Sequence, residues 1–188
     1  MNLLKHRRTI RKFSQKPIDK KMLLEFVDCA RLAPSAGNLQ PLKYIVECSP
    51  AGNAKIFPLT KWAAYLKVSG PPKPDEAPTA YIVILNDATV GSVHFALDAG
   101  AAAMSIITAA ENDGLSSCWI ASVDKAALAE LYSLPDTMQI VSVIALGYAA
   151  EKSQTVKFSG DVKYFRNPDG SLSVPKRSLD EVLLYPPL

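Results

Sequence analysis

A run of twelve residues without a charged side chain, from Ala99 to Ala110, constrains the fold more than any other part of this chain. The run consists of small and apolar residues, and the segment from Ser92 to about Asn112 is predicted to form one long helix. Because such a helix has no charged face to present to water, it must lie inside its own domain or pack against another chain. Twelve residues are too few to cross a bilayer, which requires roughly 20 helical residues.

The size and composition of the chain indicate one globular domain. Its 188 residues are 48% hydrophobic and 21% charged, which is enough apolar material for a core and atypical of a disordered chain. Three cysteines and two histidines lack the spacing of a disulfide framework or a zinc site. No apolar segment follows the basic N-terminus as in a secretory signal. We therefore predict a single domain over residues 1–188 that is soluble and cytoplasmic and has neither a metal nor a membrane partner.

Several common active-site motifs are absent from the sequence. None of the nine glycines forms a G-x-G pattern, so the dinucleotide fingerprint and the Walker A loop are missing. The G-x-S-x-G nucleophile elbow is also missing. If the chain is an enzyme, its chemistry is expected to come from a bound cofactor rather than from a catalytic triad.

Helical and strand patterns are interspersed along the whole chain. Helices are predicted at residues 2–8, 20–33, 92–112 and 124–133, with N-caps at Asp19 and Asp124, and a last short helix follows the capping box Ser178-x-x-Glu181. Strands are predicted at residues 42–48, 81–85, 115–120 and 140–146, the last ending at Gly147. Residues 49–78 contain six of the 14 prolines and are predicted to form a loop-rich excursion around a short helix. These patterns predict an α+β domain with a mixed sheet wrapped by helices.

Positive charge is concentrated at the two ends of the chain, although the net charge is only +3. Five basic residues lie within eight positions near the N-terminus: Lys5, Arg7, Arg8, Arg11 and Lys12. A second basic pair, Lys176 and Arg177, lies close to the C-terminus. Such clusters are typical either of a solvated surface or of a site that binds phosphate.

Five short blocks give the sequence its strongest functional signal. Residues 6–13 read HRRTIRKF and residues 30–41 read ARLAPSAGNLQP, while the other blocks are GLSSCWI at 114–120, LGYA at 146–149 and PKRSLDEV at 175–182. In this order they resemble the nitroreductase family of FMN flavoproteins, whose opening is R-R-[ST]-x-[RK]-x-[FY] and whose first loop is A-P-S-x-x-N-x-Q-P. The resemblance spans nearly the whole chain. It implies a nitroreductase-like α+β fold, with a central mixed, mainly antiparallel sheet wrapped by helices, in an intertwined homodimer.

The resemblance also implies that FMN is held by three parts of the chain. The basic residues and Thr9 would surround the ribityl phosphate, which guanidinium groups bind through charge-assisted, bidentate hydrogen bonds. The loop after Pro34 would reach the flavin of the partner subunit, although it also suits an ordinary turn between a helix and a strand. The segment after Cys118 would lie along one flavin face. The expected cofactor-binding residues are Arg7, Arg8, Thr9, Arg11, Pro34, Ser35, Ala36, Asn38, Gln40, Trp119, Ile120, Ala121, Ser122, Lys176 and Arg177.

Three further positions have expectations of their own. Many family members carry a Glu-Gly pair where this chain has Ala121-Ser122, so the carboxylate of that pair is absent here. Trp62 and Tyr65 lie in the excursion, which covers the substrate side in the family, and are candidates either to stack on substrate or to pack locally. Cys118 is expected to be a small buried hydrophobic residue rather than a redox centre.

The function implied by the resemblance is that of an FMN-dependent oxidoreductase with a ping-pong mechanism. NADH or NADPH would pass a hydride to flavin N5, and the reduced flavin would reduce a nitroaromatic, a quinone or a similar conjugated acceptor, with no catalytic side chain. One alternative is an enzyme of the same fold that consumes flavin or removes halogen from aromatic substrates. Another is a basic module that binds nucleic acid or an anionic membrane, but the chain lacks the interleaved aromatic residues of such a module, and neither partner is expected.

Overall fold

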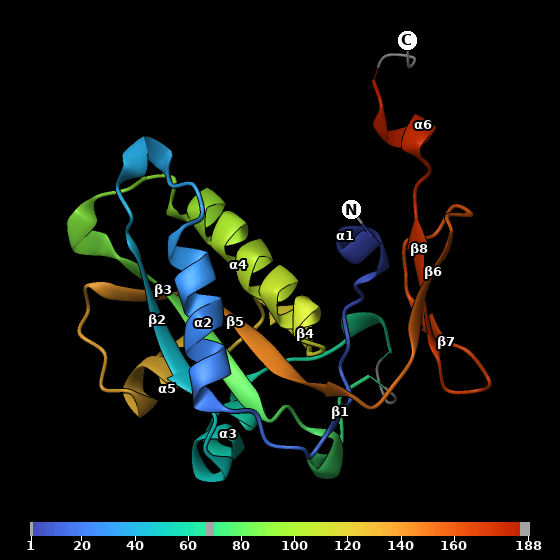
Figure 1. The fold of residues 1–188 in the computed structure, drawn as a ribbon, viewed down its shortest axis with the longest axis horizontal. Helices are drawn as coiled ribbons and strands as arrows, with labels where there is room; N and C mark the ends of the chain where they lie inside the picture. The colour runs from blue at the N-terminus through green and yellow to red at the C-terminus, as the bar shows by residue number, and fades with distance from the viewer. Residues whose placement is uncertain (1, 67–69, 185–188) are drawn as a thin grey trace.

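The structure, a computed structural model, describes residues 2–66 and 70–184 and has an antiparallel sheet of five strands at its centre (Figure 1). The strands are β1 (Phe13–Ser14), β2 (Leu42–Glu47), β3 (Ala80–Asp87), β4 (Ser116–Ile120) and β5 (Met138–Ala149). The helices are α1 (Asn2–His6), α2 (Lys20–Arg31), α3 (Pro50–Ile56), α4 (Phe95–Asn112), α5 (Lys125–Leu131) and α6 (Leu179–Val182). β5 is the longest strand and pairs with β1, β3 and β4, while β2 pairs with β3.

Each face of the main sheet has its own hydrophobic core. Alternate side chains of β3 point to opposite faces, so Ile82 and Ile84 pack with residues of α2 and α4. Tyr81 and Val83 pack on the other face with Ile56 of α3 and with residues of α5. All six residues from position 80 to position 85 are buried, as expected for a strand with a continuous apolar run that is covered on both faces.

The long helix α4 is buried along one side and open along the other. Its buried residues, which face α2 and the sheet, are Asp98, Ala99, Ala102, Ala103, Ile106, Ile107 and Ala110. On the opposite side Leu97 is 72% exposed, and Ala101 and Met104 are partly exposed. Packing within the domain therefore accounts for only one side of this nearly uncharged helix, and among residues 2–66 and 70–184 nothing fully covers the other, mainly apolar side.

The predicted end of the last main strand at Gly147 is wrong. β5 continues through Gly147 to Ala149, and Gly147 pairs with Ser116 of β4. A Cβ atom at this position would lie 2.6 Å from Cδ1 of the buried Phe13. The glycine therefore permits close packing inside a strand rather than a turn after it.

The other predicted elements are present, with ends that differ by a few residues. Asp19 and Asp124 cap α2 and α5 as expected, accepting hydrogen bonds from Lys21 N and Ala127 N. The Glu181 carboxylate accepts from Ser178 N at 2.8 Å, which completes the predicted capping interaction of α6. The excursion contains the short helix α3 and several 3-10 turns, and its residues 67–69 lie outside the described residues.

A second sheet follows β5 and is not predicted by the sequence patterns. It consists of β6 (Ser153–Lys157), β8 (Leu172–Lys176) and β7 (Phe165–Arg166), in that spatial order. We call it the small sheet. It stands beside α1, and α6 projects beyond it, away from the main sheet (Figure 1). Within the described part of the chain, no helix is both long and apolar enough to span a membrane.

Candidate functional site

A cavity of about 460 Å³ lies between the N-terminal segment and the small sheet, and the charged groups on its walls are all positive. Its lining includes the cations Lys5, Arg7, Arg8, Arg11 and Lys176, together with Thr9, Thr155 and Tyr164. We call it the cationic cavity. The sequence separates Lys176 from the other four cations by most of the chain, and the fold brings all five to one place.

Two guanidinium nitrogens of residues that line this cavity are buried without a hydrogen-bond partner. They are Nε of Arg7 and Nη1 of Arg11. A buried charged donor that lacks a partner is costly, and neighbouring cations repel one another. An anion in the cavity would relieve both costs. A phosphate suits the donors because guanidinium groups bind its oxygens in a bidentate manner, so these residues could hold the phosphate of a cofactor.

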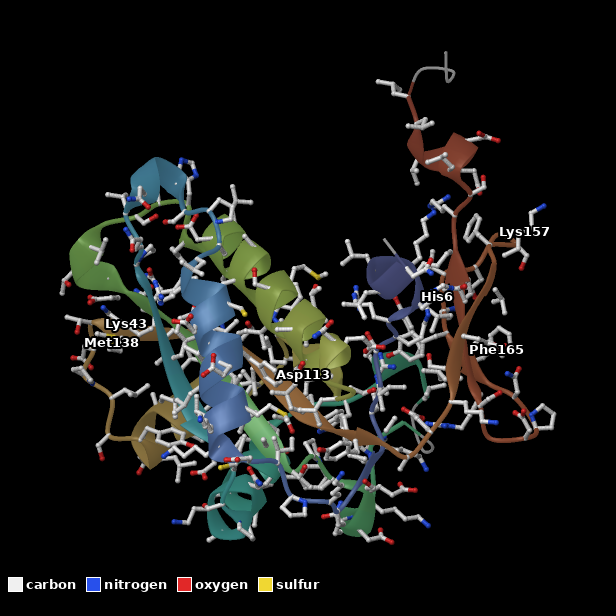
Figure 2. The ribbon with its side chains drawn as sticks, viewed as in Figure 1. His6, Lys43, Asp113, Met138, Lys157 and Phe165 are labelled. Carbon is white, nitrogen blue, oxygen red and sulfur yellow. The ribbon has the colours of Figure 1, made fainter. Side chains whose placement is uncertain are left out.

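The main chain of the N-terminal segment is fixed at Thr9 and at the two residues that follow it. Thr9 forms a parallel bridge with Ser117 of β4, and Ile10 N donates to Ser117 O at 3.0 Å. At the next residue, the Glu151 carboxylate accepts a hydrogen bond from Arg11 N at 2.6 Å. These contacts hold the arginine-rich segment against the edge of the main sheet, and His6 at its start lies beside the small sheet (Figure 2).

Glu151 also ties the small sheet to the N-terminal segment. Its side chain is only 3% exposed, and Arg166 Nη1 of β7 donates to its Oε2 at 2.9 Å. One carboxylate therefore positions both walls of the cationic cavity. Sequence reasoning missed Glu151, because a single acidic residue after a strand belongs to no recognisable spacing.

The two aromatic candidates of the excursion have different surroundings. Trp62 Nε1 donates to Thr60 Oγ1 at 2.8 Å, and its ring lies 6.2 Å from that of Phe57, so it packs within the excursion. Tyr65 is half exposed, and its ring centroid lies 5.0 Å from that of Tyr164 in the wall of the cationic cavity. Tyr65 therefore does not line the cationic cavity itself but contacts Tyr164, which does.

The segment from Trp119 to Ser122 ends β4 and leads away from its pairing with β5. Trp119 is 44% exposed, and its Nε1 donates to Ser142 Oγ at 2.8 Å, which fixes the indole ring on the sheet. Ala121 and Ser122 are exposed, whereas the side chain of Ile120 is buried in the core. A ligand at this edge could therefore contact the indole ring and the last two residues, and could contact Ile120 only through its main chain.

The loop after Pro34 is held in place by a buried carboxylate. Asp98 of α4 is 4% exposed and accepts hydrogen bonds from Ser35 Oγ and Ala36 N, both at 2.9 Å. Gln40 N in turn donates to Ser35 Oγ at 3.0 Å, which closes the loop on itself. The sequence reasoning also missed Asp98. Its position as the one acidic residue in the first half of a nearly uncharged helix could have marked it as a functional or structural polar residue.

The exposed part of this loop has an uncommon main-chain conformation. Gly37, Asn38 and Gln40 have φ values of 58°, 55° and 52°, in the left-handed region that non-glycine residues seldom adopt. Both amide side chains are exposed. The loop stands near the start of α4, whereas the N-terminal segment and the small sheet, which line the cationic cavity, lie beyond the other end of that helix (Figure 1). One chain therefore does not bring its loop and its cationic cavity together.

The two basic residues near the C-terminus are separated. Lys176 lines the cationic cavity, but Arg177 is not among the lining residues. The Arg177 guanidinium lies 4.4 Å from the centroid of the Phe158 ring, and its Nη1 lies 3.9 Å from Glu181 Oε1. Of the residues expected around the phosphate, five line the cavity of the single chain: Arg7, Arg8, Thr9, Arg11 and Lys176. Arg177 is the one that does not.

Metal binding and chemistry at the Cys118 thiol are two further possibilities for this chain. Among residues 2–66 and 70–184, no three His, Cys, Asp or Glu side chains are grouped so that they could hold a metal ion. Cys118 is buried, and burial raises the pKa of its thiol to about 11. At neutral pH the thiol is therefore protonated and a poor nucleophile, in keeping with a buried hydrophobic residue.

Comparison with known families identifies the class of protein that this fold and site represent. Residues 4–148 match the model of the nitroreductase family, so the chain belongs to this family, whose members are oxidoreductases. This membership confirms the resemblance read from the five sequence blocks and the predicted α+β fold. The matched segment ends before the small sheet begins.

Individual relatives agree with the family assignment. A protein of Archaeoglobus fulgidus, provisionally named NADH dehydrogenase/NAD(P)H nitroreductase, is 27% identical over 176 residues, which cover 90% of this chain and 94% of that protein. A solved FMN-dependent nitroreductase of Clostridium difficile has 26% identity and a TM-score of 0.68, covering 80% of this chain and 87% of its own. A second solved nitroreductase family protein of that species has a TM-score of 0.71 at 22% identity and covers 99% and 97% of the two chains, which supports the fold.

Proposed function

We propose that this chain is an FMN-dependent oxidoreductase that uses NADH or NADPH to reduce nitroaromatics, quinones or similar conjugated acceptors in a ping-pong cycle. The observation that carries the proposal is the cationic cavity, whose five cations face no acidic lining residue and include two buried guanidinium nitrogens without partners. The names of the relatives, NAD(P)H nitroreductase and FMN-dependent nitroreductase, support the choice of donor and cofactor.

The residues of the cationic cavity fit the phosphate of FMN. Arg7 and Arg11 would hold the phosphate oxygens, with Thr9 as a hydroxyl donor and Lys176 as a point charge from the opposite wall. Trp119 and the residues after it, at the end of β4, would lie along the flavin ring. When bound, FMN supplies the acceptance and donation of hydride at N5. The role of this chain is to bind and orient the cofactor, and no side chain is assigned as catalytic.

We also propose that the working form is a homodimer in which the loop after Pro34 completes the site of the partner subunit. The loop is held rigidly by Asp98, presents two exposed amides, and stands away from the cationic cavity of its own chain. The uncovered side of α4 and the projecting α6 supply apolar surface for the contact. Leu179, Val182 and Leu184 are 67%, 63% and 87% exposed, which is typical of surface that another chain covers.

The cofactor released from the purified protein tests this function. Heat should release FMN, identified by chromatography, at about one per subunit, because each chain contributes one cationic cavity. Stopped-flow reduction of the bound flavin by NADH and by NADPH then identifies the donor. Release of FAD, or failure to bind any flavin after reconstitution, would contradict the proposal and leave the basic binding module as the reading to pursue.

A further inference from the structure

Arg11 is held by two contacts that leave the hydrogen-bonding edge of its guanidinium unused. Its main-chain N–H donates to Glu151 Oε1 at 2.6 Å, and its guanidinium carbon lies 4.5 Å from the centroid of the Tyr164 ring. Its Nη1 is buried and has no partner. The Glu151 carboxylate therefore fixes the backbone of Arg11, and the face of the Tyr164 ring fixes its side chain.

This arrangement preserves the full binding capacity of the guanidinium. The donors of a guanidinium point outward in its plane, whereas a cation–π contact uses the face of that plane. A carboxylate partner would orient the group by consuming the same N–H groups that a phosphate needs. The Tyr164 ring orients it without consuming them, so the ordering cost is met before the ligand arrives.

Tyr164 is itself held by a residue from a distant part of the chain. The Tyr65 ring packs against it with a centroid distance of 5.0 Å and an interplanar angle of 59°. Tyr164 directly precedes β7 of the small sheet and lies beyond the segment matched by the family model. Arg11, Tyr164 and Tyr65 thus form one stack built from the N-terminal segment, the small-sheet region and the excursion.

We propose that Tyr164 is a positioning residue that holds the edge of Arg11 toward the cationic cavity and so sets the affinity for the phosphate group of the flavin. This inference rests on the proposed function, because it takes FMN as the ligand of the cavity. Tyr164 acts through Arg11, so its effect is confined to ligands that carry the phosphate.

The first test compares FMN with riboflavin, which lacks the phosphate. Tyr164→Leu removes the aromatic face and should weaken FMN binding about 3- to 30-fold, the range of a cation–π contact from exposed to desolvated sites. Riboflavin affinity should stay at its wild-type value, whereas the Tm of the apoprotein should fall slightly because the contact with the Tyr65 ring is lost. Tyr164→Phe keeps the ring and should restore FMN affinity to within about twofold. Phe165→Leu, an exposed neighbour in the small sheet (Figure 2), is the matched control and should change neither affinity.

A double-mutant cycle tests whether Tyr164 works through Arg11. In the Arg11→Ala background, Tyr164→Leu should change FMN affinity by less than about twofold, because the group that it positions is gone. Undiminished FMN affinity in Tyr164→Leu, an equal loss of riboflavin affinity, or full additivity with Arg11→Ala would each overturn the inference. A wild-type protein that binds no flavin would instead overturn the proposed function.

Discussion

At the scale of single residues, the cationic cavity shows how the same residue type can have different functions in one chain. Arg7 and Arg11 have buried nitrogens without partners, whereas Arg31 is paired with Asp28 on the surface and Arg177 lies over Phe158. The sequence motif identified the N-terminal arginines because their spacing resembles a known pattern. Glu151 and Asp98 position the candidate site just as directly, but each is a lone acid whose partners are distant in sequence.

Removing Arg7 is expected to weaken FMN binding strongly. A charge-assisted hydrogen bond in a partly desolvated site contributes about 1.5–3 kcal/mol, so Arg7→Ala should raise the Kd for FMN about 10- to 150-fold. Fluorescence quenching on titration of the apoprotein with FMN measures this change. Arg31→Ala, which removes an exposed arginine from a surface ion pair, should leave the Kd unchanged. Equal affinities in both variants would remove Arg7 from the phosphate site.

Breaking the buried ion pair of Glu151 should destabilise the fold. In Glu151→Gln the Arg166 guanidinium loses its anionic partner where both side chains are largely buried, and such losses cost about 3–5 kcal/mol. Urea unfolding followed by circular dichroism gives the free energy of unfolding. Asp161→Asn breaks an exposed pair with Lys163 and should leave the midpoint unchanged. A stable Glu151→Gln protein would show that the two walls are joined by other contacts.

The three thiols should differ sharply in reactivity. Cys29 is exposed, whereas Cys118 is buried with its pKa raised to about 11. Because a raised pKa keeps a thiol protonated at all pH values below it, Cys118 should not react with an aromatic disulfide reagent at pH 8 in the folded protein. Cys29 should react first, and Cys118 only after addition of denaturant. In Cys29→Ala the fast phase should disappear, and a fast phase that persists there would contradict this order.

At the scale of elements, the predictions are confirmed where they depend on residues that are neighbours in the sequence. They are wrong where a contact between distant residues determines the structure. The apolar run of β3 and the capping residues Asp19 and Asp124 are read from neighbouring residues alone, and each is found in the structure. The sequence pattern predicts that the strand ends at Gly147, because glycine commonly ends a strand. Glycine is needed at position 147 because the Phe13 ring, from a distant part of the sequence, packs directly against it.

The small sheet was missed for a related reason. Its strands are short, and their buried residues are few, Leu172 and Ser173 being the clearest. Strands of this kind lack the alternation that marks a half-buried strand. They are stabilised by pairing with one another and by Arg166, so the wall that they contribute to the cationic cavity could not be predicted from the sequence.

A side chain at position 147 is expected to disrupt the packing of β1 on β5. In Gly147→Val the new Cβ would clash with Phe13, since the nearest ring atom is 2.6 Å away, and overpacking of this kind costs about 1–3 kcal/mol. Thermal unfolding measures the loss, and Phe13→Leu in the same chain should recover part of it. Gly100→Ala is the matched control, because a Cβ there meets only Trp119 at 3.9 Å. A Gly147→Val protein as stable as wild type would show that Phe13 moves aside freely.

At the scale of the whole molecule, two surfaces lack partners among the residues that the structure describes. The outer side of α4 and the apolar face of α6 are exposed, and the loop after Pro34 is ordered without touching the cavity that it would serve. A single chain accounts for none of these features. A second copy would cover the apolar surfaces and bring each loop to a flavin, as proposed above.

Placing a charge on the outer side of α4 should therefore remove both the dimer and the cofactor. Leu97→Glu puts a carboxylate on a residue that is 72% exposed, so the fold of the monomer should tolerate it while the contact does not. Light scattering gives the mass and absorbance gives the bound flavin. Ala126→Glu, on exposed α5 across the main sheet, should change neither. A folded Leu97→Glu monomer that keeps FMN would refute the shared site, and an intact dimer would exclude this side of α4 from the contact.

The cationic cavity takes one wall from residues 4–11 and the other from residues 155–176, almost the full length of the chain away. During synthesis, the first wall leaves the ribosome long before the second has been translated. Until then its arginines face water without the residues that enclose the cavity. A phosphate bound as proposed above could be enclosed only after Lys176 has emerged, so a product terminated before Thr155 would lack a closed cavity. Retention of the ligand proposed above would thus report that translation had passed Lys176.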